Sequence, residues 1–116
     1  MEGRDLAAAR SALHEALDRY EALEDSEGVG YVLVAVARLL VPTDPELAAR
    51  ALGASNTALA SVGATLEAVE EHVRGVAEAH LRTILDEATF AAELAEGAGQ
   101  SWDGWVLIAR TSLQGA

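Results

Sequence analysis

The chain has 116 residues, of which 51% are hydrophobic, and its 19 acidic and 8 basic residues give a formal charge of −11. This length suits one domain, residues 1–116. The acidic balance argues against binding to nucleic acids or anionic membranes, which require basic patches. Cysteine is absent, which excludes disulfides, thiolate catalysis and cysteine–zinc sites. Aromatic residues make up only 4%, so we expect a core of alanine, leucine and valine in helices.

The first predicted helix follows Asp5, a favourable N-cap residue, and is expected to end near Asp25. Apolar residues recur along it at helical spacing: Leu6, Ala9, Leu13, Ala16, Leu17, Tyr20 and Leu23. Its other side is strongly acidic, which we interpret as a solvated helix face. The first residues of the chain lack the apolar segment of a signal peptide, so a cytoplasmic location is expected.

The second predicted element, Val29–Val41, is apolar on every side and carries Arg38 as its only charge. A helix that is hydrophobic all round must be covered all round, so we predict that it is the central helix and that Pro42 ends it. A buried strand is the alternative, since periodicity does not separate the two in a short apolar run. No other segment resembles a strand, however, and the run exceeds the usual strand length of about six residues. It is also shorter than the about 20 residues of a membrane span.

The third predicted helix has the clearest start signal, because Asp44 is a good cap, Pro45 suits the first helical position and Glu46 suits the first turn. Gly63 is expected to stop it. Its apolar positions are Leu47, Ala48, Ala51, Leu52, Ser55, Leu59 and Val62. Its small residues, including Gly53, allow another helix to approach closely.

The fourth helix is expected to begin at a Thr65 cap, and the fifth to run from about Asp86 to Glu96 and to be ended by Gly97-Ala98-Gly99. The residues predicted to face inward are Leu66, Val69, Val73, Val76, Leu81 and Ile84 on the fourth helix, and Phe90, Ala91 and Leu94 on the fifth. Acid–base pairs four residues apart mark exposed helix sides: Glu15–Arg19, Glu46–Arg50, Glu70–Arg74 and Glu78–Arg82.

Ser101 is predicted to cap a sixth helix. Its inward residues are Trp105, Ile108, Ala109 and Leu113. Trp102 and Trp105 are the bulkiest side chains in this part of the chain, so we expect them to seal the open end of the helical stack.

The polar residues form no pattern that supports catalysis, so the chain is predicted not to be an enzyme. His72 and His80 are too far apart on one helix for a zinc or di-metal motif, and His14 has no second ligand in view. Gly97-Ala98-Gly99 lacks the Lys-Ser/Thr ending of a phosphate loop. We therefore expect no catalytic residue, no metal site and no cofactor.

An internal repeat links the first and third helices, because Arg4–Leu13 aligns with Thr43–Leu52. Each unit has an acid in a tight turn followed by an alanine-rich helix, which resembles the second helix of a tetratricopeptide unit, although the period is longer than the usual about 34 residues. We predict an all-α fold, a tetratricopeptide-like stack of five or six antiparallel helices. Residues 1–63 would be degenerate repeats and residues 64–116 capping helices.

A second resemblance covers more of the chain. Asp44–Ala54 is similar to a D-P-E-x-A-A-R-L-L-G-A stretch, and Leu85–Gly97 precedes a short helix in the same way. Together they resemble the C-terminal tail of large bacterial LuxR-type and AfsR-type transcriptional regulators, which carry an ATPase and tetratricopeptide repeats. The resemblance implies a non-catalytic protein–protein interaction or sensor-arm segment. The ATPase, the upstream repeats and the DNA-binding helix-turn-helix of that family are missing from this sequence.

The repeat interpretation predicts where a partner binds. The chain begins at the second helix of a repeat, so apolar surface near Leu6–Leu17 should be exposed or covered by another chain. The predicted interaction surface, for a protein partner or for self-association through apolar helix faces, comprises Leu6, Leu13, Leu17, Leu33 and Leu40. The side of the second helix that carries Gly30, Leu33, Ala37 and Leu40 would accept an apolar helix, unless the later helices fold over it.

The alternative function is that of a small helical ligand-sensing domain. Its pocket would lie between Val32–Leu40, Val73–Leu81 and the two tryptophans. Such a sensor should contain an enclosed cavity on the order of a few hundred Å³, whereas a scaffold should not.

Overall fold

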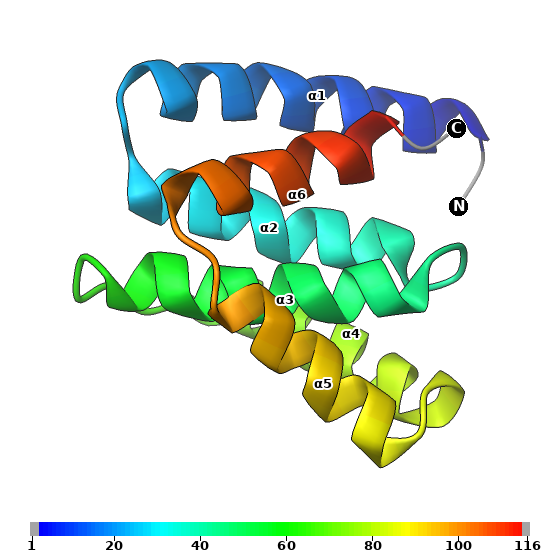
Figure 1. Cartoon of the computed structure of the whole chain (residues 1–116). Coiled ribbons are helices and arrows are strands. Elements are labelled where there is room, and N and C mark those ends of the chain that lie inside the picture. The colour runs from blue at the N-terminus through cyan, green and yellow to red at the C-terminus, as the bar shows by residue number, and fades with distance from the viewer. Residues whose placement is uncertain (1–2, 115–116) are drawn as a thin grey trace.

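The computed structural model describes residues 3–114 of the chain, and the side chains from Leu6 onward. The helices in this range are α1 (Gly3–Ala22), α2 (Ser26–Leu40), α3 (Pro45–Ala60), α4 (Ala68–Ile84), α5 (Glu87–Ala98) and α6 (Trp102–Gln114). No strand occurs between residues 3 and 114, and successive helices run in alternating directions (Figure 1). The predicted all-helical fold is confirmed.

The central position of α2 is also confirmed. This helix packs against α1, α3, α4 and α6. Leu33 and Val36 are 0% and 1% exposed, and Leu40 is 5% exposed. Because each such side chain gains roughly 1.5–3 kcal/mol on burial, the apolar run of α2 supplies much of what holds the other helices together.

The end of α1 differs from the prediction. The helix ends at Ala22, where the amides of Glu24 and Asp25 bond to the carbonyls of Glu21 and Tyr20 at 3.1 and 2.9 Å. This pattern requires a residue in the left-handed region, and Glu24 occupies it with φ 53°. Asp25 is therefore not the last residue of α1 but the N-cap of α2, and its carboxylate accepts a bond from the Gly28 amide at 3.0 Å.

The start of α1 differs as well, because the helix already includes Asp5 and begins at Gly3. The predicted N-cap role of Asp5 was wrong, since a cap residue lies outside the helical turn that it closes.

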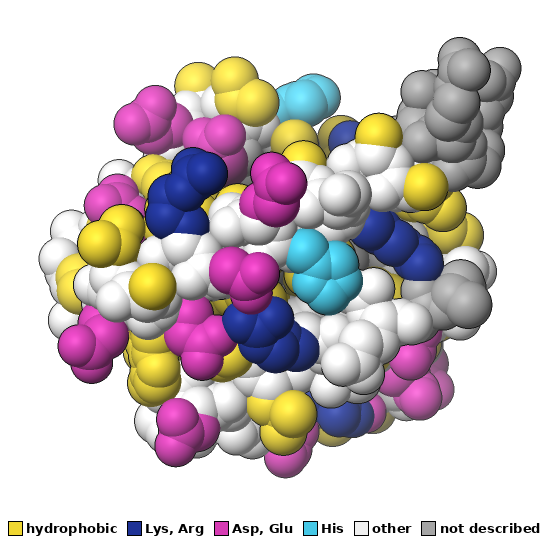
Figure 2. Space-filling view, turned by 90° about the horizontal axis from the view of Figure 1, so that it is seen from above, with side chains coloured by type: hydrophobic (Ala, Val, Ile, Leu, Met, Phe, Trp, Pro, Cys, Tyr) yellow, Lys and Arg dark blue, Asp and Glu magenta, His cyan; other side chains and the backbone are white. Residues whose placement is uncertain are grey.

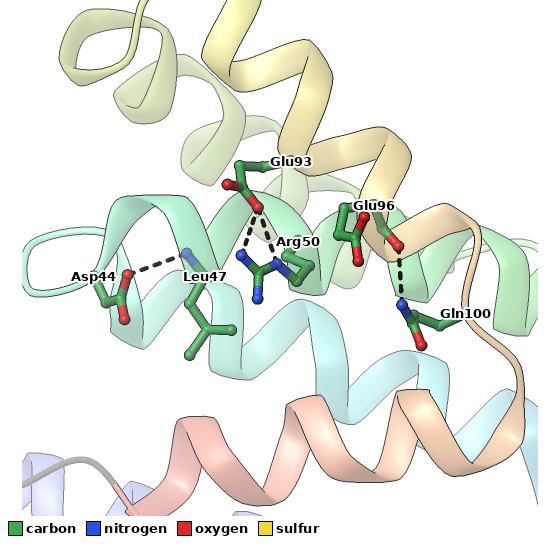
Figure 3. A network of polar contacts seen from close by, with 6 residues as sticks. All are labelled: Asp44, Leu47, Arg50, Glu93, Glu96 and Gln100. Carbon is green, nitrogen blue, oxygen red and sulfur yellow. Dashed lines mark hydrogen bonds and ion pairs between the residues drawn. The ribbon is translucent and has the colours of Figure 1, made fainter.

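The start of α3 is as predicted. Pro45 is its first residue, and the Asp44 carboxylate accepts from the Leu47 amide at 3.2 Å (Figure 3). Its end is a second left-handed turn, in which Gly63 has φ 67° and the Ala64 amide bonds back over five residues to Leu59 at 2.9 Å. Val62 lies beyond the last helical residue and is 56% exposed, so its expected place on α3 was wrong.

Two glycines bring α3 and α5 into backbone contact. A Cβ atom added to Gly53 would collide with the Leu94 carbonyl, and one added to Gly97 would collide with the Arg50 carbonyl. The segment Gly97-Ala98-Gly99 was expected to end the fifth helix, and Gly99 is the C-cap of α5. Gly97 itself lies inside α5, which continues to Ala98, and this position is small because the helices cross there.

Polar contacts flank this crossing. The Arg50 guanidinium lies 2.8 Å from the Glu93 carboxylate, which Figure 3 shows reaching from α5 to α3. At the other end, the Thr57 hydroxyl donates to the Ala98 carbonyl at 2.7 Å. The sequence spacing predicted that Arg50 pairs with Glu46 of its own helix, but Arg50 pairs across helices with Glu93.

The predicted starts of α4 and α5 agree with the structure to different degrees. Asp86, expected as the approximate first residue of the fifth helix, is the N-cap of α5 and accepts from the Thr89 amide at 2.7 Å. The predicted cap Thr65 was wrong, because the N-cap of α4 is Glu67, whose side chain makes no capping bond. Phe90 faces the core, but Ala91, expected beside it, is exposed.

The inward side of α6 is as predicted. Its buried residues include Trp105, Ile108, Ala109 and Leu113. The Trp105 indole donates to the Gln100 carbonyl at 3.0 Å, so its polar atom is satisfied within the core. None of the helices between residues 3 and 114 combines the length and the apolarity that crossing a membrane would require.

Candidate interaction surface

The residues predicted to form an interaction surface lie mostly in the core. Leu17 and Leu33 are 0% exposed and Leu40 is 5% exposed, while Leu6 and Leu13 are half-buried on α1. In this fold the first three are already covered by the chain itself. The surface expected from these five leucines is therefore not assembled.

The physical reason is the way the helices pack. Helix α2 packs against α1, α3, α4 and α6, and α6 runs back against α1, α2 and α3. The Arg110 guanidinium fastens it to α1, with Asp18 at 2.8 Å and Glu21 in closer contact. Seen from above, the α1 side of the molecule mixes acids, arginines and small apolar areas (Figure 2).

The side of α2 that was considered as a groove is filled as well. Gly30 and Ala37 are buried together with Leu33 and Leu40. The leucine side chain of Leu59 on α3 lies so close to Gly30 that a Cβ atom there would meet it at 2.9 Å. The later helices α4 and α6 also pack on α2, which was the second of the two outcomes weighed from the sequence.

Two of the large exposed apolar residues lie on one helix, α4. Its fully buried residues are Ala77 and Leu81, whereas Val69 is 69% and Ile84 52% exposed. Val73 and Val76 are half-buried. The inward stripe predicted for this helix is therefore only partly inward, and we name its open part, Val69, Val73, Val76 and Ile84, the α4 stripe.

These four residues share one side of the helix. At 100° per residue they fall within about 80° of one another, beside the direction of the buried Ala77. His80 lies on the same side and is exposed. The stripe is thus an apolar edge of α4 that His80 interrupts between Val76 and Ile84.

A group of glutamates lies at the N-terminal end of this stripe, around Tyr31 of α2. The Tyr31 hydroxyl is 3.3 Å from the Glu27 carboxylate and 3.4 Å from the Thr65 carbonyl. Burial of the phenol, followed by the charges of Glu27, Glu67 and Glu70, raises the pKa of Tyr31. We name Glu27, Glu67 and Glu70 the glutamate cluster.

The glutamate cluster has no ion-pair partner on α4, because Arg74 binds other residues. Arg74, predicted to pair with Glu70, bonds instead to Glu78 at 2.8 Å and donates to Ser55 on α3 at 3.2 Å. Arg82, predicted to pair with Glu78, bonds to Glu87 at 2.9 Å. Among the residues that the structure describes, no ion pair involves a member of the glutamate cluster.

Two hollows lie on the surface, and neither is the predicted sensor pocket. One of about 230 Å³ lies between the end of α3 and Arg74. The other, of about 340 Å³, lies between Arg10, the turn that precedes α3, and α6. The predicted pocket would need space beside Leu33, Ala77 and Leu81, but these side chains are packed together and 0% exposed.

The titratable residues do not converge on a chemical centre within the described part of the chain. His72 and His80 are exposed, and His14 is half-buried on α1. Among residues 3–114, no three histidine or carboxylate side chains gather closely enough to hold a metal ion.

The two tryptophans form an edge-to-face pair at the start of α6, with ring centroids 6.3 Å apart. Trp105 belongs to the hydrophobic core, and Trp102 packs against that core while remaining half-buried. Their rings therefore act as packing groups in this structure.

Tyr31 is a feature of this surface that the sequence interpretation missed. A signal for it exists, because Tyr31 is the only residue with a polar aromatic tip in the apolar run and Glu27 stands one helical turn before it. The proximity of Glu67 and Glu70 has no such local signal, since it depends on how α4 packs beside α2.

Comparison with known proteins gives no match for this chain among protein-family models, curated protein sequences or solved structures.

Proposed function

We propose that this chain is a non-catalytic protein–protein interaction module, and that it binds its partner through the α4 stripe. The observation that carries the proposal is the exposure of Val69 and Ile84 on a helix of which only Ala77 and Leu81 are buried in the core. Apolar residues exposed along one side of a helix on a folded domain are typical of interaction sites. The other large exposed apolar side chains do not share a helix with one another, because Leu23 follows α1, Val62 follows α3 and Leu107 is on α6.

The proposal extends to the context in which the module works. The residues Asp44–Ala54 and Leu85–Gly97 resemble the C-terminal helical-repeat segment of bacterial LuxR-type and AfsR-type regulators. The alternating helix directions, with α2 beside α4 and α3 beside α5, are compatible with a tetratricopeptide-like stack. We propose a cytoplasmic module that links such a regulator to another protein.

A selection experiment tests the interaction function without knowledge of the natural partner. Random peptides displayed on phage are selected against the chain, and the recovered sequences are measured against Val69→Ser/Ile84→Ser. The matched control is Leu107→Ser, because Leu107 on α6 is 67% exposed and thus comparable to Val69 at 69%.

We expect related peptides that lose at least about tenfold in affinity on the Val69→Ser/Ile84→Ser variant, and little on Leu107→Ser, because a few buried apolar anchors dominate such interfaces. Recovery of no related peptides, or equal binding to both variants, would remove the basis for this function.

A further inference from the structure

We propose that the segment that binds the α4 stripe is a basic amphipathic helix, whose apolar side covers the stripe and whose cationic side chains reach the glutamate cluster. This inference rests on the proposed function, because it names the class of partner for the same face.

The geometry of the stripe favours a helix over an extended peptide. From Val69 to Ile84 the stripe is about 22 Å long at 1.5 Å per residue. The backbone of α4 is bonded within the helix, so this face offers no strand edge for an extended peptide to join. A partner must satisfy its own backbone bonds and present only side chains, which an α-helix of about four turns does.

The charges favour a cationic partner. The Tyr31 hydroxyl lies 3.3 Å from the Glu27 carboxylate and 3.4 Å from the Thr65 carbonyl, which places Glu27 beside the start of α4, where Glu67 and Glu70 stand. Arg74 is turned toward α3 and Glu78. A lysine or arginine placed there would gain from unpaired carboxylates that stand beside an apolar surface.

The same charges disfavour a second copy of this chain as the occupant. Each copy carries a formal charge of −11 and would bring its own glutamate cluster toward the interface. Like charges placed together at an interface cost affinity and slow association.

Three fluorescent peptides of equal length test the inference against the intact chain by anisotropy titration. The first is an amphipathic helix with leucines on one side and lysines on its flanks. The second replaces the lysines with glutamates, and the third keeps the first composition but scrambles the order so that no apolar side forms. We expect the first peptide to bind at least about tenfold more tightly than either of the others, because both the apolar side and the charge are required.

A pair of charge-matched variants separates the cluster from the overall acidity. Glu27→Gln/Glu67→Gln/Glu70→Gln removes the cluster, while Glu15→Gln/Glu46→Gln/Glu96→Gln changes the net charge equally at exposed positions elsewhere. We expect the first variant to weaken binding of the basic peptide about tenfold and the second by less than about twofold at about 0.15 M salt, because screening limits distant charges. Circular dichroism verifies that both variants keep their helices.

The outcomes distinguish this inference from the function on which it rests. If the basic and acidic peptides bind equally, or if the two charge variants lose the same affinity, the basic-partner inference is wrong. If, in that case, the affinity for the basic peptide still falls on Val69→Ser/Ile84→Ser, the interaction function stands. Binding that ignores Val69→Ser/Ile84→Ser overturns both.

Discussion

Two residues of this chain, Glu24 and Tyr31, have an unusual conformation or unusual surroundings. Glu24 occupies a left-handed backbone position at the end of α1, with φ 53°. Tyr31 presents its hydroxyl to carboxylates at the end of the α4 stripe. Neither property follows from residue type, because glutamate is rarely left-handed and tyrosine in an apolar run is usually a packing residue.

Glu24→Gly should stabilise the chain by about 1 kcal/mol, because glycine adopts the left-handed conformation without the Cβ penalty. Gly63→Ala is the converse, since Gly63 has φ 67° with open space around it, and it should cost about 1 kcal/mol. Urea unfolding followed by circular dichroism measures both. A loss of stability in Glu24→Gly would show that the turn has no strain to relieve.

Tyr31 should ionise above its ordinary pKa of 10.0, because burial and the neighbouring glutamates disfavour the phenolate. The folded chain then holds this proton more tightly than the unfolded chain does. The stabilisation is complete below pH 10 and is lost as the pH rises through the raised pKa. Ultraviolet titration should show a late-ionising tyrosine that Tyr31→Phe removes and that Glu27→Gln/Glu67→Gln/Glu70→Gln shifts downward. An unchanged titration in the glutamate variant would mean that the cluster does not act on Tyr31.

At the scale of helices, local signals located some boundaries and missed those that depend on packing. Asp44 was a recognisable cap because the bond that it accepts lies within its own turn. Of the segment Gly97-Ala98-Gly99, only Gly99 caps α5, and the contact role of Gly97 was missed because a glycine that ends a helix and one that admits a neighbouring helix look alike in sequence. The pairing of Arg74 was misjudged because its guanidinium contacts Ser55 on α3 as well as Glu78, and the position of Ser55 depends on how the helices pack.

Alanine substitutions of Gly97 and Gly75 should have opposite effects on stability, because only Gly97 lies at the α3–α5 crossing. Gly97→Ala should destabilise the chain by about 2–3 kcal/mol, because the new Cβ meets the backbone carbonyl of Arg50, which cannot move aside without shifting α3. Gly75→Ala in α4 meets nothing within 4 Å and should stabilise by up to about 1 kcal/mol through helix propensity. Chemical denaturation compares the two. Equal effects would contradict backbone contact at the crossing.

At the scale of the whole molecule, the arrangement follows from one apolar helix that its neighbours must cover. The sequence was sufficient to identify α2 as that helix, because no side of it carries the polar residues that water requires. It was not sufficient to identify the open surface. Leu17, Leu33 and Leu40 are as hydrophobic as Val69 and Ile84, and the packing of the helices decides which of them are covered.

Leu33→Ala should therefore cost about 3–5 kcal/mol, because Leu33 is 0% exposed at the centre of the core and its removal leaves a cavity. Leu107→Ala should change stability by less than about 0.5 kcal/mol, because Leu107 is 67% exposed. The urea midpoints of the two variants provide the comparison, provided that the slope of the free energy of unfolding against urea concentration is unchanged. Similar midpoints for the two variants would contradict a core built around α2.

The most direct test of the interaction surface is backbone amide chemical-shift mapping while the basic amphipathic peptide is added to the chain. We predict that the amides with changed chemical shifts lie along α4, from Val69 to Ile84, and near Tyr31. The chemical shifts of the amides around Leu107 on α6 should not change. Perturbations confined to α1 and α6, or none at peptide saturation, would contradict the assignment of the α4 stripe as the binding face.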